Sequence, residues 1–157
     1  MEAPSILITG ASSGFGLLTA RLALSRGLKV AATARRPEAI PLKSAGGFLK
    51  LRLDVTERAA MDGAVEKAIA AFGALDAVVN NAGVANFGAA EEVSEEELRL
   101  EFETNFFGAT ALTKTVLPHL RVPVGQDAQA WCGARFREDE EAFVHRLARH
   151  YRWTGTR

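Results

Sequence analysis

The chain has 157 residues, 48% of them hydrophobic, and its 19 lysines and arginines balance 19 aspartates and glutamates. This size predicts one domain with its own core, while the zero net charge gives no support for nucleic-acid binding. No apolar run approaches a membrane span. The single cysteine, Cys132, excludes an internal disulfide, and no signal-peptide pattern is visible, so we expect a cytoplasmic protein without membrane attachment.

The first apolar run, residues 6–8, predicts a short strand buried on both faces. The segment TGASSGFG follows at 9–16, and a helix pattern then extends over about 15–26, with Gly27 as a stop signal. A glycine-rich turn between a strand and a helix suits a pyrophosphate, because its backbone can approach the phosphates and the helix N-terminus is partly positive. Its spacing is GxxxGxG rather than GxGxxG, so a tight turn in another α/β protein is the alternative.

Two more strands are predicted at 28–33 and 48–55, separated by a loop rich in proline and glycine with room for a short helical turn. The second of these alternates leucine with charged residues, which is typical of a strand near a sheet edge. A helix over 57–72, with Thr56 as its N-cap, and a strand over 75–80 follow.

Ser94 and Glu97 form a capping-box pattern at the start of another helix. We expect this helix to bend or break near Glu103 and to continue to about residue 117, with Phe102, Phe106 and Phe107 in the core or in helix packing. The alternation of strands and helices predicts an α/β fold: a doubly wound parallel sheet in the order 3-2-1-4 with helices on both faces.

Four further motifs narrow this prediction. Asp54-Val55 ends the third predicted strand, Asn80-Asn81-Ala82-Gly83 ends the fourth, and the sequences NFFG at 105–108 and VLPHL at 116–120 lie in the last helix. At these spacings, residues 4–121 closely resemble the cofactor-binding half of the short-chain dehydrogenase/reductase family. The resemblance implies a Rossmann-type fold and hydride transfer between a nicotinamide cofactor and a carbonyl or secondary alcohol.

The resemblance also implies roles for individual residues. Asn105 matches the family's catalytic asparagine, which holds a water in a proton relay. The helix over 105–117 matches one that family members use for packing in homo-oligomers. Pyrophosphate contacts fall to Gly10, Ser12, Ser13, Gly14, Phe15 and Gly16, adenine contacts to Asp54 and Val55, and the adenosine and ribose side to Asn81, Ala82 and Gly83.

The end of the second predicted strand bears on the choice of cofactor. Proteins that prefer NAD usually have an acid there to hold the ribose hydroxyls. Here the sequence is Thr-Ala-Arg-Arg at 33–36, and arginine can form two hydrogen bonds to a 2′-phosphate. We therefore expect NADP rather than NAD, with Arg35 as the main contact and Arg36 as the second; two solvated loop arginines are the alternative.

The family's chemistry also uses a serine and a tyrosine with a lysine four residues later. In this sequence the one tyrosine, Tyr151, is followed four residues later by Gly155, no lysine follows Lys114, and no serine follows Ser94. We therefore expect two parts: a truncated Rossmann domain at 1–121 and an atypical tail at 122–157 with room for one helix at about 138–151. If the chain is a non-functional fragment, its fourth strand is an unpaired edge.

Three functional readings stay open at this point. The chain is an oxidoreductase of this lineage that is inactive alone, a non-catalytic module for dinucleotide binding or subunit pairing, or a truncated or frameshifted gene product. A frameshift and a genuine alternative end both account for the tail. We expect no metal site, because His145 and His150 lack a ligand spacing. Cys132 has no recognisable catalytic partner.

Overall fold

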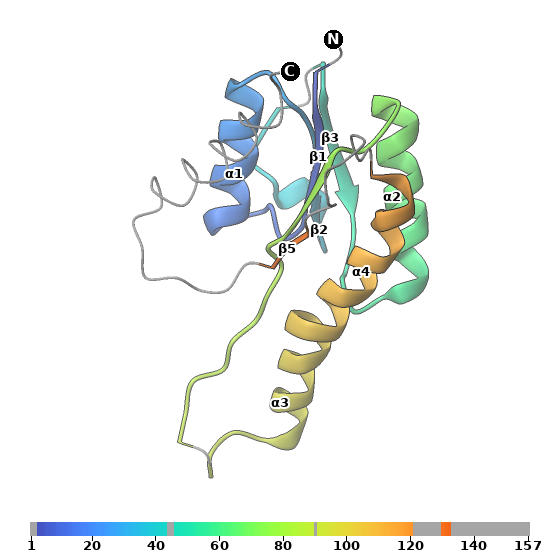
Figure 1. The fold of residues 1–157 in the computed structure, drawn as a ribbon. Helices are drawn as coiled ribbons and strands as arrows, with labels where there is room; N and C mark the ends of the chain where they lie inside the picture. Colours follow the sequence, from blue (N-terminus) through green and yellow to red (C-terminus); the bar gives the residue numbers. More distant parts are fainter. Residues whose placement is uncertain (1–2, 44–45, 90, 121–129, 133–157) are drawn as a thin grey trace.

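The computed structural model describes residues 3–43, 46–89, 91–120 and 130–132, and these form a parallel sheet covered by helices on both faces (Figure 1). The strands are β1 (Ser5–Ile8), β2 (Lys29–Ala34), β3 (Phe48–Arg52), β4 (Ala77–Asn80) and β5 (Ala130–Cys132). Their order is β3-β2-β1-β4-β5, and every neighbouring pair is parallel. The predicted Rossmann-type order 3-2-1-4 is therefore confirmed.

The strand β1 lies in the centre of the sheet, and all four of its residues are buried. Alternation along the strands divides the core into two layers. One layer joins Ile6 and Ile8 to α1 (Gly14–Ser25), and the other joins Leu7 to α2 (Arg58–Phe72) and α4 (Ala109–Val116). Figure 1 shows α1 on one side of the sheet and α2 with α4 on the other. A strand covered on both faces is expected to be apolar, as Ile6, Leu7 and Ile8 are; the remaining residue, Ser5, satisfies its buried hydroxyl through hydrogen bonds to Ala74 and Asp76.

The strand β3 lies at the edge of the sheet, as its alternating sequence predicts. It pairs with β2 alone among the described strands, and it is shorter than expected because pairing stops at Arg52. The loop before it contains the 3₁₀ turn η1 (Pro37–Ala39), which corresponds to the expected short helical turn.

The helical stretch after β4 changes its hydrogen-bond pattern twice. It begins as α3 (Glu95–Phe102), becomes the π-helical segment η2 (Glu103–Gly108), continues as α4 and ends in the 3₁₀ turn η3 (Leu117–His119). The capping box at Ser94 is present, since its hydroxyl accepts from the Glu97 N–H and Glu97 accepts from the Ser94 N–H. The predicted break near Glu103 is confirmed as the start of the π segment.

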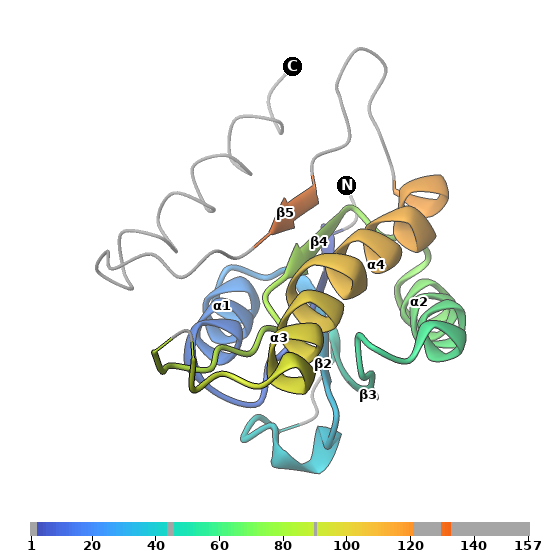
Figure 2. The same ribbon diagram turned by 90° about the horizontal axis from the view of Figure 1, so that it is seen from below.

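The strand β4 is not the unpaired edge that was expected for a non-functional fragment. The strand β5 pairs with it in parallel, with Val78 opposite Ala130 and Asn80 opposite Cys132 (Figure 2). The segment is only three residues long and follows no βαβ pattern, so its sequence did not indicate a strand. The open hydrogen-bonding groups of β4 supply the reason for pairing, because parallel neighbours satisfy backbone N–H and C=O groups.

Two side-chain expectations are also wrong. Thr56 is not the N-cap of α2; the cap position is Glu57, no side chain caps it, and the Thr56 hydroxyl instead donates to Asp54. Phe102, Phe106 and Phe107 are 56%, 58% and 49% exposed, so they lie outside the core. The predicted helix over 138–151 lies outside the described residues. No helix in the described part combines the length and apolar character that a bilayer crossing requires.

Candidate functional site

The glycine turn after β1 is held against the end of β4 by Asn81. Its side-chain amide donates to the carbonyls of Thr9, at 2.9 Å, and Gly10, at 3.2 Å. A Cβ on Gly16 would lie 2.4 Å from the Gly10 carbonyl oxygen, and a Cβ on Gly10 would lie 2.9 Å from Ala82 Cα. Glycine is therefore required at both positions because the backbone of one segment occupies the space of a side chain on the other.

Gly14 serves a different purpose from Gly10 and Gly16. It has φ +53°, and a Cβ there would meet nothing within 4 Å. Gly14 is the first residue of α1, the hydroxyl of the preceding Ser13 caps no N–H, and the first turn contains no acidic residue. Ser13 and Gly14 are exposed. The α1 N-terminus therefore presents main-chain N–H groups and partial positive charge toward open space, which is the requirement for binding a phosphate.

Thr9 organises this junction, and sequence reasoning missed it. Its hydroxyl accepts from the N–H groups of Asn81, at 3.0 Å, and Ala82, at 2.9 Å, and donates to the Val79 carbonyl at 3.3 Å. The residue is 1% exposed. A polar side chain at the end of a strand buried on both faces was the available signal, since a buried hydroxyl needs hydrogen-bond partners.

The end of β2 supplies positive charge beside the end of β3. Arg35 and Arg36 follow β2 directly and are both exposed. Burial raises the pKa of Asp54, but hydrogen bonds from the Thr56 N–H and hydroxyl, together with the charges of Arg35 and Arg52, outweigh it, so this pKa lies below its usual value. Asp54 is therefore an ionised carboxylate held in place by Thr56 and lying in the field of Arg35.

Asn105 lies in the π segment and bonds to the loop after β4. Its Oδ1 accepts from the Val84 N–H at 2.9 Å, and its Nδ2 donates to the Val84 carbonyl at 2.7 Å. A Cβ on Gly83 would lie 3.2 Å from Asn105 Oδ1. These bonds orient the amide and fix the Val84 main chain, while the water-holding role remains a prediction.

The structure thus brings most of the predicted site together along the carboxyl ends of the strands. Gly10, Gly16, Asn81 and Ala82 meet directly, Gly83 meets Asn105, and Arg35 acts on Asp54. Val55 is buried, and its carbonyl oxygen lies 2.7 Å from where a Cβ on Gly108 would be. In open α/β sheets, ligands bind at this edge.

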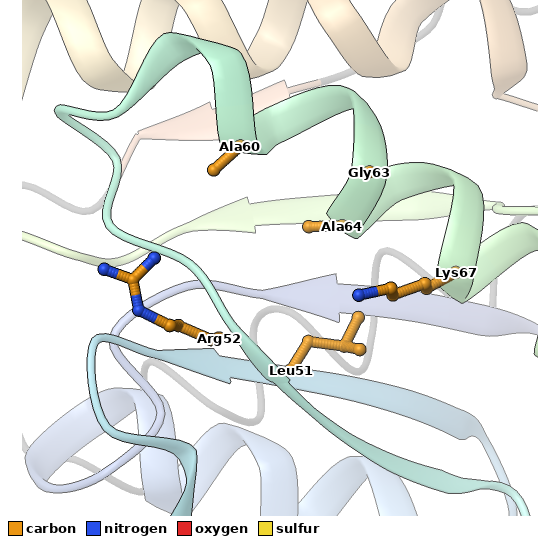
Figure 3. A pocket seen from close by; sticks show the side chains of 6 residues that line it. All are labelled: Leu51, Arg52, Ala60, Gly63, Ala64 and Lys67. Atoms are coloured by element: carbon orange, nitrogen blue, oxygen red, sulfur yellow. The ribbon is translucent and has the colours of Figure 1, made fainter.

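A concavity lies away from these strand ends, between the edge strand β3 and helix α2. It measures about 300 Å³ and is lined by Leu51, Arg52, Ala60, Gly63, Ala64 and Lys67 (Figure 3). Arg52 already forms two hydrogen bonds to Glu57, each 2.8 Å long. The lining residues are separate from the predicted cofactor residues. Within the described ranges, no group of three or more His, Cys, Asp or Glu side chains is arranged to hold a metal ion.

Comparison of the sequence with known proteins identifies relatives of this chain. A family model described as short chain dehydrogenase matches residues 4–128. The 3-ketodihydrosphingosine reductase of Bacteroides thetaiotaomicron is 41% identical over 121 residues, which is 77% of this chain and 44% of that protein. The uncharacterized oxidoreductase YxnA of Bacillus subtilis is 42% identical over 120 residues, which is 73% of this chain and 34% of that protein. The chain spans less than half the length of the curated relatives it matches.

Solved structures that resemble this chain include proteins of the same kind as these sequence relatives. A short-chain dehydrogenase from Streptomyces avermitilis superposes with a TM-score of 0.72 at 40% identity, covering 76% of this chain and 45% of that one. The 3-ketoacyl-(acyl-carrier-protein) reductase of Brucella melitensis, solved with NADH, gives a TM-score of 0.71 at 34% identity, covering 75% of this chain and 50% of that one.

Proposed function

Because the chain belongs to the short-chain dehydrogenase/reductase family, we propose that its described domain binds NADP(H) along the carboxyl ends of β1, β2 and β4. One observation carries the proposal: an uncapped α1 N-terminus, with an open glycine at Gly14, faces outward beside a turn that Asn81 holds in place. Gly10, Ser12, Ser13, Gly14, Phe15 and Gly16 hold the pyrophosphate. Main-chain N–H groups with no acid nearby suit two linked phosphates.

The remaining contacts follow the order of the strand ends. Asp54 and Val55 lie beside the adenine, and Asn81, Ala82 and Gly83 form the adenosine and ribose side of the site. Arg35 and Arg36 suit a 2′-phosphate better than a free ribose hydroxyl pair, because a guanidinium is positively charged and can donate two hydrogen bonds to a phosphate. Arg35 is exposed and directly follows the strand end. NADH is the natural competitor, since the Brucella relative was solved with it.

The chemistry we propose for the lineage is the reduction of a carbonyl group. When bound, the nicotinamide supplies or accepts the hydride. The names of two relatives support a 3-keto group as the substrate class, one on a sphingoid base and one on an acyl thioester. For Asn105, whose side-chain amide is bonded to the Val84 main chain, we propose the family role of holding a water in the proton relay.

We propose further that the 157 residues alone bind cofactor without turnover. The proton-donating tyrosine of the family needs a lysine four residues later to bring its pKa near the working pH, and Tyr151 has Gly155 there. A dinucleotide-binding or subunit-pairing module is therefore the form of the function that this sequence supports. We place the pairing surface on the helical stretch over 105–117, because the exposed rings of Phe106 and Phe107 lie on it.

Calorimetric titration of the purified chain with NADPH and with NADH tests the binding proposal. We expect saturable binding of both, with NADPH tighter. Absence of heat with either nucleotide, for a chain shown to be folded by circular dichroism, would overturn the proposal. In the same preparation, a 3-ketoacyl thioester with NADPH should give no loss of NADPH absorbance. Measurable oxidation would contradict the proposed lack of turnover and leave the binding site in place.

A further inference from the structure

The π segment that carries Asn105 lies between two loops of the proposed cofactor site. On one side, Asn105 bonds to both main-chain groups of Val84. On the other side, Gly108 packs so closely on Val55 that a Cβ on Gly108 would lie 2.7 Å from the Val55 carbonyl oxygen. The π segment is thus the physical connection between the loop after β3 and the loop after β4.

Arg58 fastens the segment on the Val55 side. One nitrogen of its guanidinium donates to the main-chain carbonyl of Phe107, and another pairs with the carboxylate of Glu103. Glu103 is the first residue of the π segment and Phe107 is its last but one, so a single side chain contacts both ends. A planar guanidinium can do this because its donors diverge in fixed directions, whereas a lysine ammonium is a compact point charge.

The position of Arg58 in its own helix supports a role beyond that helix. Arg58 is the first residue of α2, and the first turn contains no acid. A cation at a helix N-terminus is unfavourable toward the helix dipole. The contacts of Arg58 with Glu103 and Phe107 give this cation a compensating interaction, and both partners lie on a different element.

The local hydrogen-bond pattern explains why such a support is needed. A π turn is rare and occurs mostly as a single turn inside an α-helix, frequently at a functional site. Here its side chains cannot be held by the core, because only Thr104 and Gly108 of the segment are buried. Contacts from outside the helix must therefore determine how Asn105 is presented.

We propose that Arg58 is a positioning residue: it fixes the π segment and, through the Asn105 amide, the main chain at Val84. This inference rests on the proposed cofactor site, since the Val84 loop is one wall of that site. Arg58 acts through Asn105 rather than through the nucleotide. Loss of its two contacts should therefore loosen Val84 while leaving the strands of the sheet unaffected.

The test compares three variants of the full 157-residue chain. Arg58→Gln removes the ion pair with Glu103 and most of the hydrogen-bond donors of the guanidinium. Arg58→Lys keeps the positive charge, and Arg99→Gln is the ion-pair control. Arg99 forms a more exposed ion pair with Glu95 in α3, with side chains 77% and 71% exposed against 40% and 44% for Arg58 and Glu103, and its hydrogen bonds reach neither loop. Two quantities are measured: the hydrogen-exchange rate of the Val84 amide, with that of Leu7 in β1 as internal reference, and the affinity for NADPH from its fluorescence.

We expect Arg58→Gln to accelerate exchange at Val84 about tenfold with Leu7 unchanged, and to weaken NADPH binding by about three- to fivefold. Arg58→Lys should restore part of both, because an ammonium can reach one of the two acceptors. Arg99→Gln should match the parent chain. Unchanged exchange at Val84, or equal acceleration at Leu7, would overturn the positioning role. If the parent chain binds no NADPH, the proposed function fails, and the exchange comparison still decides the role of Arg58.

Discussion

The side-chain nitrogen of Asn81 lies 2.5 Å from the point where a Cβ on Gly16 would be, so the Asn81 amide fills the space that a side chain on residue 16 would need. The same nitrogen donates to the carbonyls of Thr9 and Gly10. Residues from the ends of β1 and β4 and the start of α1 therefore meet at Asn81. This contact makes the geometry of the glycine turn depend on a segment far away in the sequence.

Substitution of Gly16 by alanine should disturb this contact. The added methyl group would fall on the Gly10 carbonyl oxygen and the Asn81 amide, so the free energy of unfolding should decrease by about 1–3 kcal/mol. NADPH affinity should fall as well, because the turn must move. Urea unfolding and calorimetric titration measure the two effects. The matched control is Gly63→Ala in α2, where a Cβ meets nothing within 4 Å; it should stabilise the chain by about 0.5–1 kcal/mol. Equal effects of the two substitutions would contradict the packing argument.

Asn81→Asp changes the chemistry of the same contact while keeping the size of the side chain. A carboxylate oxygen would replace the donor nitrogen and face the carbonyl oxygens of Thr9 and Gly10. We expect a loss of about 2–3 kcal/mol of unfolding free energy, because acceptors face each other in a partly buried position. Asn86→Asp, in the exposed loop after β4, is the isosteric control and should change stability little. Thermal unfolding of both variants measures the two effects. An Asn81→Asp chain as stable as the parent would contradict the role of the Asn81 amide as a donor to Thr9 and Gly10.

Arg35 should determine the preference between NADPH and NADH. Arg35→Ser removes a donor pair for the 2′-phosphate, so NADPH affinity should fall about tenfold while NADH affinity stays nearly unchanged. Arg26→Ser, which removes an exposed arginine at the other end of α1, should change neither affinity. Paired titrations with the two nucleotides give the ratio. A parallel loss of both affinities in Arg35→Ser would show that Arg35 supports the loop rather than the phosphate.

Asp54 should make stability depend on pH in the acid range. Its pKa in the folded chain is lower than its ordinary value near 3.8, because the Thr56 hydrogen bonds and the nearby arginines outweigh the effect of burial. A carboxyl group with a depressed folded pKa contributes stability that is fully present above its unfolded pKa. That contribution is lost as the pH falls through the folded pKa.

The comparison of the parent chain with Asp54→Asn isolates this contribution. The parent should be more stable by about 1 kcal/mol or less at pH values above the unfolded pKa, since the group is partly exposed. The difference should shrink as the pH falls below 3.8. Urea unfolding over this range measures it. Because Glu57 also has a lowered pKa, through its hydrogen bond with Arg52, only the difference between the two chains reports Asp54. A difference that grows toward acid pH would reverse the assigned sign.

Much of the fold was predictable because its signals are local. An apolar strand, a glycine turn and an amphipathic helix recur in a fixed order, so β1, α1, β2 and β4 were expected within a few residues of their observed bounds. The capping box at Ser94 and the break at Glu103 are local as well. The edge position of β3 followed from its alternating charges.

The failures have a different origin. Thr56 is a residue type that often caps a helix N-terminus, yet its hydroxyl donates to Asp54. The residue type alone does not decide between these two hydrogen bonds. The three phenylalanines from 102 to 107 look like core residues, but all three are exposed, because the buried face of this helical stretch consists of Thr104, Gly108, Leu112 and Val116. The pairing of 130–132 with β4 depends on open groups of a distant strand.

The parallel α/β order, the family resemblance and the residue types offered to a dinucleotide could all be predicted from the sequence, because propensity, period and motif spacing act along the chain. How those residues work together could be seen only in the folded molecule. The approach of Asn81 to Gly16, the Thr9 hydroxyl between β1 and β4, and the bonds of Arg58 to the π segment join residues more than 40 positions apart. Such contacts depend on how elements pack against one another, and that information lies in the three-dimensional arrangement of the sheet and its helices.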